Sequence, residues 1–359
     1  MKIPLFWPQI YKEEWLKALG KTFDTRWIGQ GPLVEKFEQE FGLKFGYKYC
    51  LAVNSGTSAL DLAYHMVGIE KGDEVLTPVL TCTATNIPLL RRRAKLKFVD
   101  IDDNLLPSFE DIAQKITNKT KAIVVVNLGG LQVDKRIFKL AKNKNIPVII
   151  DAAQSVGLSE KYGDYVCYSF QAIKHFTTGD GGMLIIRKKK LYDKAKKLRW
   201  FGIDREAKKR ANWKWSVNHQ MALDIEELGF KYHMNDMAAS MGLVGLTNSD
   251  NILKYRKALC DIYNQELSEY TKICGGSYWL FGILDDHRNH LMDFLSEHGI
   301  ESDPIQIRND IFSVFGGKRH NLPNMKRLED KYLYLPLNGK ITIKDVRKVI
   351  RALKEWKKK

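Results

Sequence analysis

Short apolar runs alternate with segments of helical spacing along roughly the first 250 residues of the chain. The apolar runs predict strands at residues 49–53, 72–78, 96–100, 122–126, 147–151 and 182–186. Stretches between them, such as 133–144 and 189–200, have the spacing of amphipathic helices. Because strands that alternate with helices usually form parallel sheets, we expect an α/β fold with a mostly parallel sheet and helices on both faces.

The pattern changes towards the C-terminus. Helices are expected at 237–246 and 250–269, and the second would lead into a different arrangement. There the expected elements are a strand at 277–283, a helix at 289–298, a strand near 332–337 and a helix at 343–356. With 359 residues and 44% hydrophobic content, the chain can bury a large core. We expect a large domain over residues 1–248 and a smaller α+β domain over 249–359.

Polar and glycine-rich loops follow several predicted strands, at 55–58, 78–86, 127–130 and 151–154. Ligands bind beyond the carboxyl ends of the strands in such sheets, so these loops predict a pocket, although ordinary surface loops have a similar composition. Residues 55–58, Ser-Gly-Thr-Ser, would begin a helix, where backbone N–H groups and the hydroxyls of Thr57 and Ser58 can surround a phosphate. An ordinary helix N-cap explains the same residues equally well.

Two side chains carry candidate chemistry. Asp151 ends the predicted strand 147–151, and Lys174 precedes the glycine-rich turn 179–182. This combination suits a pyridoxal 5'-phosphate (PLP) site, where a lysine forms a Schiff base and a carboxylate keeps the pyridine nitrogen protonated. The alternatives are a strand-end cap for Asp151 and an exposed loop lysine for Lys174.

The chain carries a net charge of +16, spread over short clusters such as 91–93, 187–190 and 208–210. The clusters belong to no recognisable nucleic-acid-binding module, so we expect no nucleic-acid partner. A solvated basic surface is favoured, and attraction of a phosphorylated substrate is the alternative.

Five widely spaced cysteines without a CxxC pair indicate reduced thiols in a cytoplasmic protein. No apolar run is long enough to span a membrane, and the first residues lack the apolar segment of a secretory signal. We therefore expect neither a membrane partner nor secretion.

Further motifs occur between about residues 25 and 250. They are Asn-Ser-Gly-Thr-Ser-Ala-Leu at 54–60, Thr-Pro at 77–78, Thr-Ala-Thr-Asn at 83–86, Gly-Gly at 129–130 with Asp134, Val-Ile-Ile-Asp-Ala-Ala-Gln-Ser at 148–155, Ser-Phe at 169–170, Thr-Thr-Gly-Asp-Gly-Gly at 177–182 and Gly-Phe-Lys-Tyr-His-Met at 229–234. In this order, and together with Lys174, they resemble the sugar aminotransferases of the DegT/DnrJ/EryC1/StrS family. The resemblance implies the fold of PLP-dependent transferases of fold type I, with a mostly parallel, seven-stranded type of sheet in the large domain.

The resemblance also implies roles for individual residues. Lys174 would hold the cofactor and carry the proton of the 1,3-shift, while Asp151 would pair with the pyridinium nitrogen. Gln154 would contact the phenolic oxygen of the ring. The phosphate would be held by Gly56, Thr57, Ser58 and Ser169.

Three positions depart from the usual family pattern. Cys82 stands where an aromatic side chain often stacks on the cofactor ring, and Asp180 replaces a glutamate. Lys231 occupies a position whose side chain, in the family, reaches the cofactor phosphate of the neighbouring subunit. A lysine can make the same contact as a point charge.

The function implied is PLP-dependent transfer of an amino group, commonly from glutamate, to a nucleotide-linked keto-deoxy sugar at C4 or, as the alternative, C3. Such an enzyme would serve amino-sugar and surface polysaccharide biosynthesis as a cytoplasmic homodimer with shared active sites. The aromatic segments 200–205 and 213–215 are candidate substrate contacts, or else pack at the dimer interface. Two other functions stay open: a sugar dehydratase of the same family, which would carry histidine in place of the lysine, and a non-catalytic regulatory or nucleic-acid-binding protein.

If Lys231 contacts the phosphate of the partner's cofactor, the Lys231→Ala variant should retain PLP less well, because it lacks that positive charge. Dialysis against cofactor-free buffer, followed by the visible absorbance of the protein, measures the retention. An unchanged affinity for PLP would remove Lys231 from the site.

Overall fold

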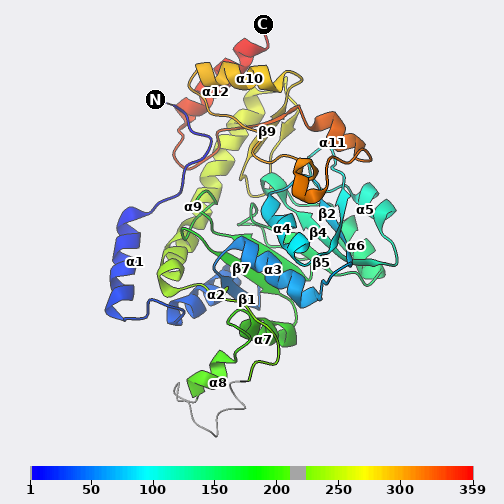
Figure 1. The fold of residues 1–359 in the computed structure, drawn as a ribbon. Coiled ribbons are helices and arrows are strands. Elements are labelled where there is room, and N and C mark those ends of the chain that lie inside the picture. Colours follow the sequence, from blue (N-terminus) through cyan, green and yellow to red (C-terminus); the bar gives the residue numbers. More distant parts are fainter. Residues whose placement is uncertain (1, 211–223, 359) are drawn as a thin grey trace.

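A computed structural model describes residues 2–210 and 224–358 of the chain. A large sheet with helices on both sides lies beside a smaller sheet that packs with the C-terminal helices (Figure 1). Before residue 211 the described helices are α1 (Lys12–Asp24), α2 (Pro32–Phe45), α3 (Gly56–Val67), α4 (Thr83–Arg91), α5 (Phe109–Lys115), α6 (Arg136–Asn143), α7 (Lys189–Leu198) and α8 (Arg205–Arg210), with a short 3-10 turn, η1, at Leu128–Gly130.

The large sheet has seven strands in the order β1-β7-β6-β5-β4-β2-β3. They are β1 (Cys50–Val53), β2 (Glu74–Pro78), β3 (Lys95–Val99), β4 (Thr120–Val126), β5 (Val148–Asp151), β6 (Tyr165–Ser169) and β7 (Gly182–Ile186). Strands β3, β2, β4, β5 and β6 are parallel to one another, while β7 runs antiparallel to both β6 and β1. The expected α/β fold with a mostly parallel sheet is confirmed.

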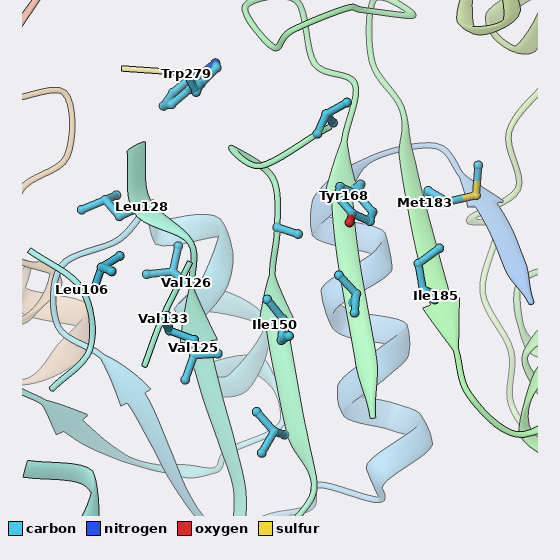
Figure 2. Packing of buried hydrophobic residues seen from close by; sticks show 14 of the residues in the cluster. Leu106, Val125, Val126, Leu128, Val133, Ile150, Tyr168, Met183, Ile185 and Trp279 are labelled. Atoms are coloured by element: carbon cyan, nitrogen blue, oxygen red, sulfur yellow. The ribbon is translucent and has the colours of Figure 1, made fainter. Parts of the chain in front are cut away.

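Successive residues of each strand pack into two different cores. In β5, for example, Val148 and Ile150 join one buried cluster and Ile149 joins the other. The second cluster contains residues of α3 and α7, whereas the first contains residues of α2, α6 and the later helix α9. Strands covered on both faces need apolar side chains at nearly every position, which explains the continuous apolar runs in the sequence. Figure 2 shows the first cluster, with Trp279 lying beyond the strands near Leu128.

Helix α9 (Asp236–Glu266) connects the large sheet to the C-terminal region as one continuous helix of 31 residues (Figure 1). The expectation of two helices, 237–246 and 250–269, is therefore wrong. Polar residues between them suggested a break, but the Thr247 hydroxyl and the Asn248 amide donate to carbonyl oxygens four residues earlier, of Leu243 and Val244. Because α9 continues through the expected boundary at 248–249, the division into two domains stays a prediction.

The C-terminal region contains an antiparallel sheet in the order β10-β9-β8. Its elements are β8 (Lys272–Ile273), β9 (Phe281–Leu284), α10 (Arg288–Glu297), η3 (Asn309–Ile311), η4 (Ser313–Phe315), α11 (Pro323–Leu328), β10 (Tyr332–Leu335) and α12 (Ile343–Trp356). The strand expected at 277–283 begins only at Phe281, because residues 275–280 leave the sheet and pack against the large sheet instead.

Cys260 and Cys274 form a disulfide, so the expectation of reduced thiols is wrong for this pair. The two residues lie in α9 and just after β8, and sequence spacing alone did not reveal that they meet. None of the described helices combines the length and the apolar character that a membrane crossing requires.

Candidate active site

A cavity of about 350 Å³ opens at the carboxyl ends of the parallel strands. Most of the residues predicted for the site line it: Gly56, Thr57, Cys82, Asp151, Gln154, Ser169 and Lys174. Ser58 and Lys231 are not among the lining residues. Loops after four different strands therefore meet at one place, as the topology of the sheet requires.

Asp151 is the last residue of β5, and its carboxylate is buried at the cavity wall. Thr85 donates a hydrogen bond to Asp151 Oδ2 at 2.6 Å, and the backbone N–H of Ala153 donates to Oδ1 at 3.0 Å. Burial raises the pKa of Asp151 above its ordinary value, while these two hydrogen bonds and the charge of Lys174 act in the opposite direction. A cationic group placed in the cavity would hold this carboxylate ionised.

Lys174 lies in the loop after β6 and is only partly exposed. Burial lowers the pKa of its amino group below the usual lysine value, and Asp151 and Cys82 partly oppose that effect. Its Nζ atom is 4.3 Å from the centre of the Trp279 ring. A lysine of lowered pKa in a cavity is suited to act as a nucleophile and as a proton carrier.

The start of α3 forms the proposed anion-binding turn. Ser55 is the N-cap, and its hydroxyl accepts a hydrogen bond from the Ser58 backbone N–H at 3.0 Å. The Ser58 hydroxyl donates to Asn54 Oδ1 at 2.6 Å, so it is used within the turn. The N–H groups of Gly56 and Thr57 lack partners within the helix and belong to residues that line the cavity. The segment is thus an N-cap that also leaves donors for an anion.

Gly56 approaches the end of β6 closely. A Cβ atom at this position would lie 2.8 Å from Ser169 Cβ, a distance that real Cβ atoms do not reach. Only glycine lets the first turn of α3 lie against Ser169, and the two elements together form one end of the cavity.

Gln154 is buried, and its amide oxygen accepts a hydrogen bond from the Gly129 backbone N–H at 2.6 Å. Gly129 and Gly130 both have positive φ angles, 67° and 92°, which explains the glycine pair after β4. Because the amide oxygen is occupied, the amide nitrogen of Gln154 remains to donate to a group in the cavity.

Cys82 is the N-cap residue of α4 and is exposed, so a small side chain stands at this wall of the cavity. Lys231 lies outside the cavity in a β-bridge with Trp200, and its expected contact with a partner subunit stays a prediction. Of the aromatic candidates, Trp200 does not line the cavity, and Trp213 and Trp215 lie outside the described residues.

Among the residues to which sequence reasoning assigned no role are Trp279 and Gln306, which line the cavity, and Thr85, which holds Asp151. Thr85 stood within a recognised motif without an assigned role. Trp279 and Gln306 come from the C-terminal region, where the Gly-Gly pair before Trp279 was a signal for a turn rather than a strand.

The residues present fit PLP: unpaired N–H groups at a helix start suit a phosphate, and a buried carboxylate and a lysine lie in the same cavity. With the mostly parallel seven-stranded sheet, they define a PLP-dependent transferase of fold type I. The chain belongs to the DegT/DnrJ/EryC1/StrS aminotransferase family, which matches residues 9–354. The resemblance read from the sequence is confirmed, and so is PLP as the cofactor, on which family members depend.

Individual relatives agree with this assignment. The chain is 30% identical to GDP-perosamine synthase of Escherichia coli O157:H7, over 99% of this chain and 98% of the relative. It is 31% identical to the spore coat polysaccharide biosynthesis protein SpsC of Bacillus subtilis (strain 168), over 98% and 96%. Among solved structures, the PLP form of Spr1654 from Streptococcus pneumoniae matches with a TM-score of 0.90 at 25% identity, over 99% of this chain and 98% of that chain. These relatives support an aminotransferase of amino-sugar and polysaccharide biosynthesis.

Thr85→Val removes the hydroxyl that donates to Asp151 while keeping the shape of the side chain. The carboxylate then loses a buried hydrogen bond, so the pKa of Asp151 rises further and its pairing with a protonated pyridine nitrogen weakens. We expect PLP affinity to fall by roughly 10- to 100-fold, measured by titrating the cofactor-free protein with PLP.

Thr83→Val is the matched control, since Thr83 is in the same helix but does not line the cavity. It should leave PLP affinity nearly unchanged. Equal affinities in the two variants would show that the Thr85 hydrogen bond does not support the cofactor.

Proposed function

We propose that this protein is a PLP-dependent aminotransferase that moves an amino group from an amino acid, with glutamate the expected donor, to a nucleotide-linked keto-deoxy sugar. The observation that supports it most is the meeting of Lys174 and Asp151 in one cavity at the carboxyl edge of the sheet. We take C4 as the position that receives the amine, with C3 as the alternative. The relatives named for perosamine and for spore coat polysaccharide synthesis support a sugar as the acceptor.

In this proposal each group that lines the cavity has one role. PLP, when bound, supplies the electron sink that allows the α-proton of an amino acid to leave. Lys174 Nζ would hold the cofactor and move the proton, and its lowered pKa leaves more of the amine unprotonated than in an exposed lysine, as both roles require. Asp151 would keep the positive charge on the ring nitrogen, and the N–H groups of Gly56 and Thr57 with Ser169 would bind the phosphate. Gln154 would donate to the phenolic oxygen.

The environment of His175 favours transamination over dehydration. His175 follows the lysine in sequence, but it is buried and its Nε2 lies 2.8 Å from the carbonyl oxygen of Ser277, outside the set of cavity-lining residues. Burial holds its pKa well below the ordinary histidine value, so the ring stays neutral and engaged with the backbone. The residue that faces the cavity is the lysine, as transamination needs.

The assembly and location also belong to this proposal. We place the enzyme in the cytoplasm as a homodimer, with Lys231 of each subunit directed to the neighbouring site. The net charge of +16 suits a substrate that carries a diphosphate. The alternative of a non-catalytic protein is less favoured, because it does not explain why a lysine and a buried carboxylate line the same cavity.

The test is a screen of nucleotide-linked keto sugars with glutamate as the donor. Release of 2-oxoglutarate, followed by mass spectrometry, reports the reaction, and NMR of the product locates the amine. Lys174→Ala should lower the rate by at least about 100-fold, because it removes the group that transfers the proton.

Lys190→Ala is the matched control, since Lys190 is an exposed lysine of α7, and it should keep full activity. A chain that binds PLP but transfers no amino group to any keto sugar would contradict the proposed acceptor. Full activity in Lys174→Ala would contradict the proposed mechanism.

A further inference from the structure

The segment 275–280 brings the C-terminal region into the active site. It leaves the small sheet between β8 and β9 and places Trp279 at the cavity wall. Trp279 is only 1% exposed, and the face of its ring lies 4.3 Å from Lys174 Nζ. Figure 2 shows this indole beyond the ends of the large-sheet strands, on the side of Leu128.

Several contacts hold the segment against the large sheet. The backbone N–H groups of Ser277 and Leu280 donate to the carbonyl oxygens of Gly130 and Gly129. A Cβ atom on Gly130 would lie 2.2 Å from the Ser277 hydroxyl, so a larger residue after β4 would push the segment away. The indole N–H of Trp279 donates to the Ile173 carbonyl oxygen at 3.3 Å. The indole is therefore fixed beside the residue that precedes Lys174.

A buried arginine of α9 holds the backbone of Trp279. Arg256 donates from one nitrogen to the carbonyl oxygens of Trp279 at 3.1 Å and Leu337 at 2.7 Å. Within the described part of the chain, its hydrogen-bond partners are carbonyl oxygens and its Nε has none. Burial lowers its pKa to about 10, which shows the cost of placing this cation inside the protein. Buried charges often add little to stability, so we look for the contribution of Arg256 in the carbonyl oxygens that it binds, those of Trp279 and Leu337.

Titratable groups from several elements lie around Lys174. Asp151 at the end of β5 and Cys82 at the start of α4 favour its protonated form, while burial opposes it. His175 is neutral, and it faces Ser277 rather than the cavity. Asp180, from the turn before β7, also lines the cavity. The indole of Trp279 adds a further contribution, because the face of an aromatic ring attracts an ammonium group.

We propose that Trp279 is an active-site residue whose indole face binds the amino group of Lys174 whenever that group is not bonded to the cofactor, and that Arg256 positions it. This inference rests on the proposed function, because only in that function is Lys174 alternately bonded to the cofactor and released from it. The contact stabilises the protonated amine and keeps it directed into the cavity. Among the described residues that line this cavity, the aromatic side chain thus comes from the C-terminal region, while position 82 contributes a cysteine.

Competitive acetylation of the full chain freed of PLP tests the contact. Limited acetic anhydride is applied across neutral to alkaline pH, and mass spectrometry of the Lys174 peptide gives the pKa of that amine. Trp279→Leu should lower the pKa of Lys174 by about half a unit to one unit, because the ring face no longer stabilises the ammonium. Trp279→Phe keeps a ring and should lower it by less.

An unchanged or raised pKa of Lys174 in Trp279→Leu would overturn the proposal. Equal shifts in the leucine and phenylalanine variants would overturn it too, because they would reflect lost packing rather than the ring face. The unchanged chain and Trp7→Leu, in which an exposed tryptophan is replaced, are the references.

The role of Arg256 is tested with the same readout. Arg256→Met should shift the pKa of Lys174 in the same direction as Trp279→Leu, and Arg256→Lys should restore part of the shift. If Arg256→Met does not fold, Arg256→Lys still tests the role of Arg256. In this variant the pKa of Lys174 should fall, but by less than in Trp279→Leu. A pKa of Lys174 equal to that of the unchanged chain would remove Arg256 from the proposal.

This experiment is independent of the proposed function. Acetylation needs neither cofactor nor substrate, so the contact can hold even if no keto sugar accepts an amine. The converse result is that the unchanged chain transfers amino groups while the pKa of Lys174 is the same in Trp279→Leu. That result would support the proposed function and contradict only this inference.

Discussion

The active site depends on a carboxylate and an amine that the fold removes from water at one edge of the sheet. Burial acts on both in the direction of neutrality, raising the pKa of Asp151 and lowering that of Lys174. The charge of each group opposes the effect of burial on the other, and two hydrogen bonds to Asp151 act in the same direction on its carboxylate. A cofactor with a basic ring nitrogen and an aldehyde matches both groups, because it offers a cation to the first and an electrophile to the second.

The loops around this pair are held from outside the large sheet. Asn309, from the C-terminal region, donates from its amide to the Thr81 carbonyl oxygen at 2.7 Å and accepts from Asn86 at 2.9 Å. The Thr81 hydroxyl lies 2.8 Å from that of Thr85, which in turn donates to Asp151. On the other side, Arg256 and the segment 275–280 fix Trp279 against Lys174. The C-terminal region therefore supports both members of the pair.

Much of the sheet and of the site could be predicted from the sequence because their signals are local. Strands buried on both faces give continuous apolar runs, and Asp151, Ser169 and Gly56 adjoin the ends of such strands. Trp279 could not be found in this way, because more than one hundred residues of chain separate it from Lys174. The hydrogen bond of the Ser58 hydroxyl could not be found either: the sequence shows a donor but does not show that Asn54 accepts from it.

The identity of the lysine is the central claim, and one measurement addresses it directly. The purified protein is loaded with PLP, reduced with borohydride, digested and analysed by mass spectrometry for the peptide that carries the pyridoxyl group. The structure predicts that the group is on Nζ of Lys174 and that loading produces a yellow colour which reduction removes. A colourless protein that takes up no PLP, or a pyridoxyl group on another lysine, would contradict the account.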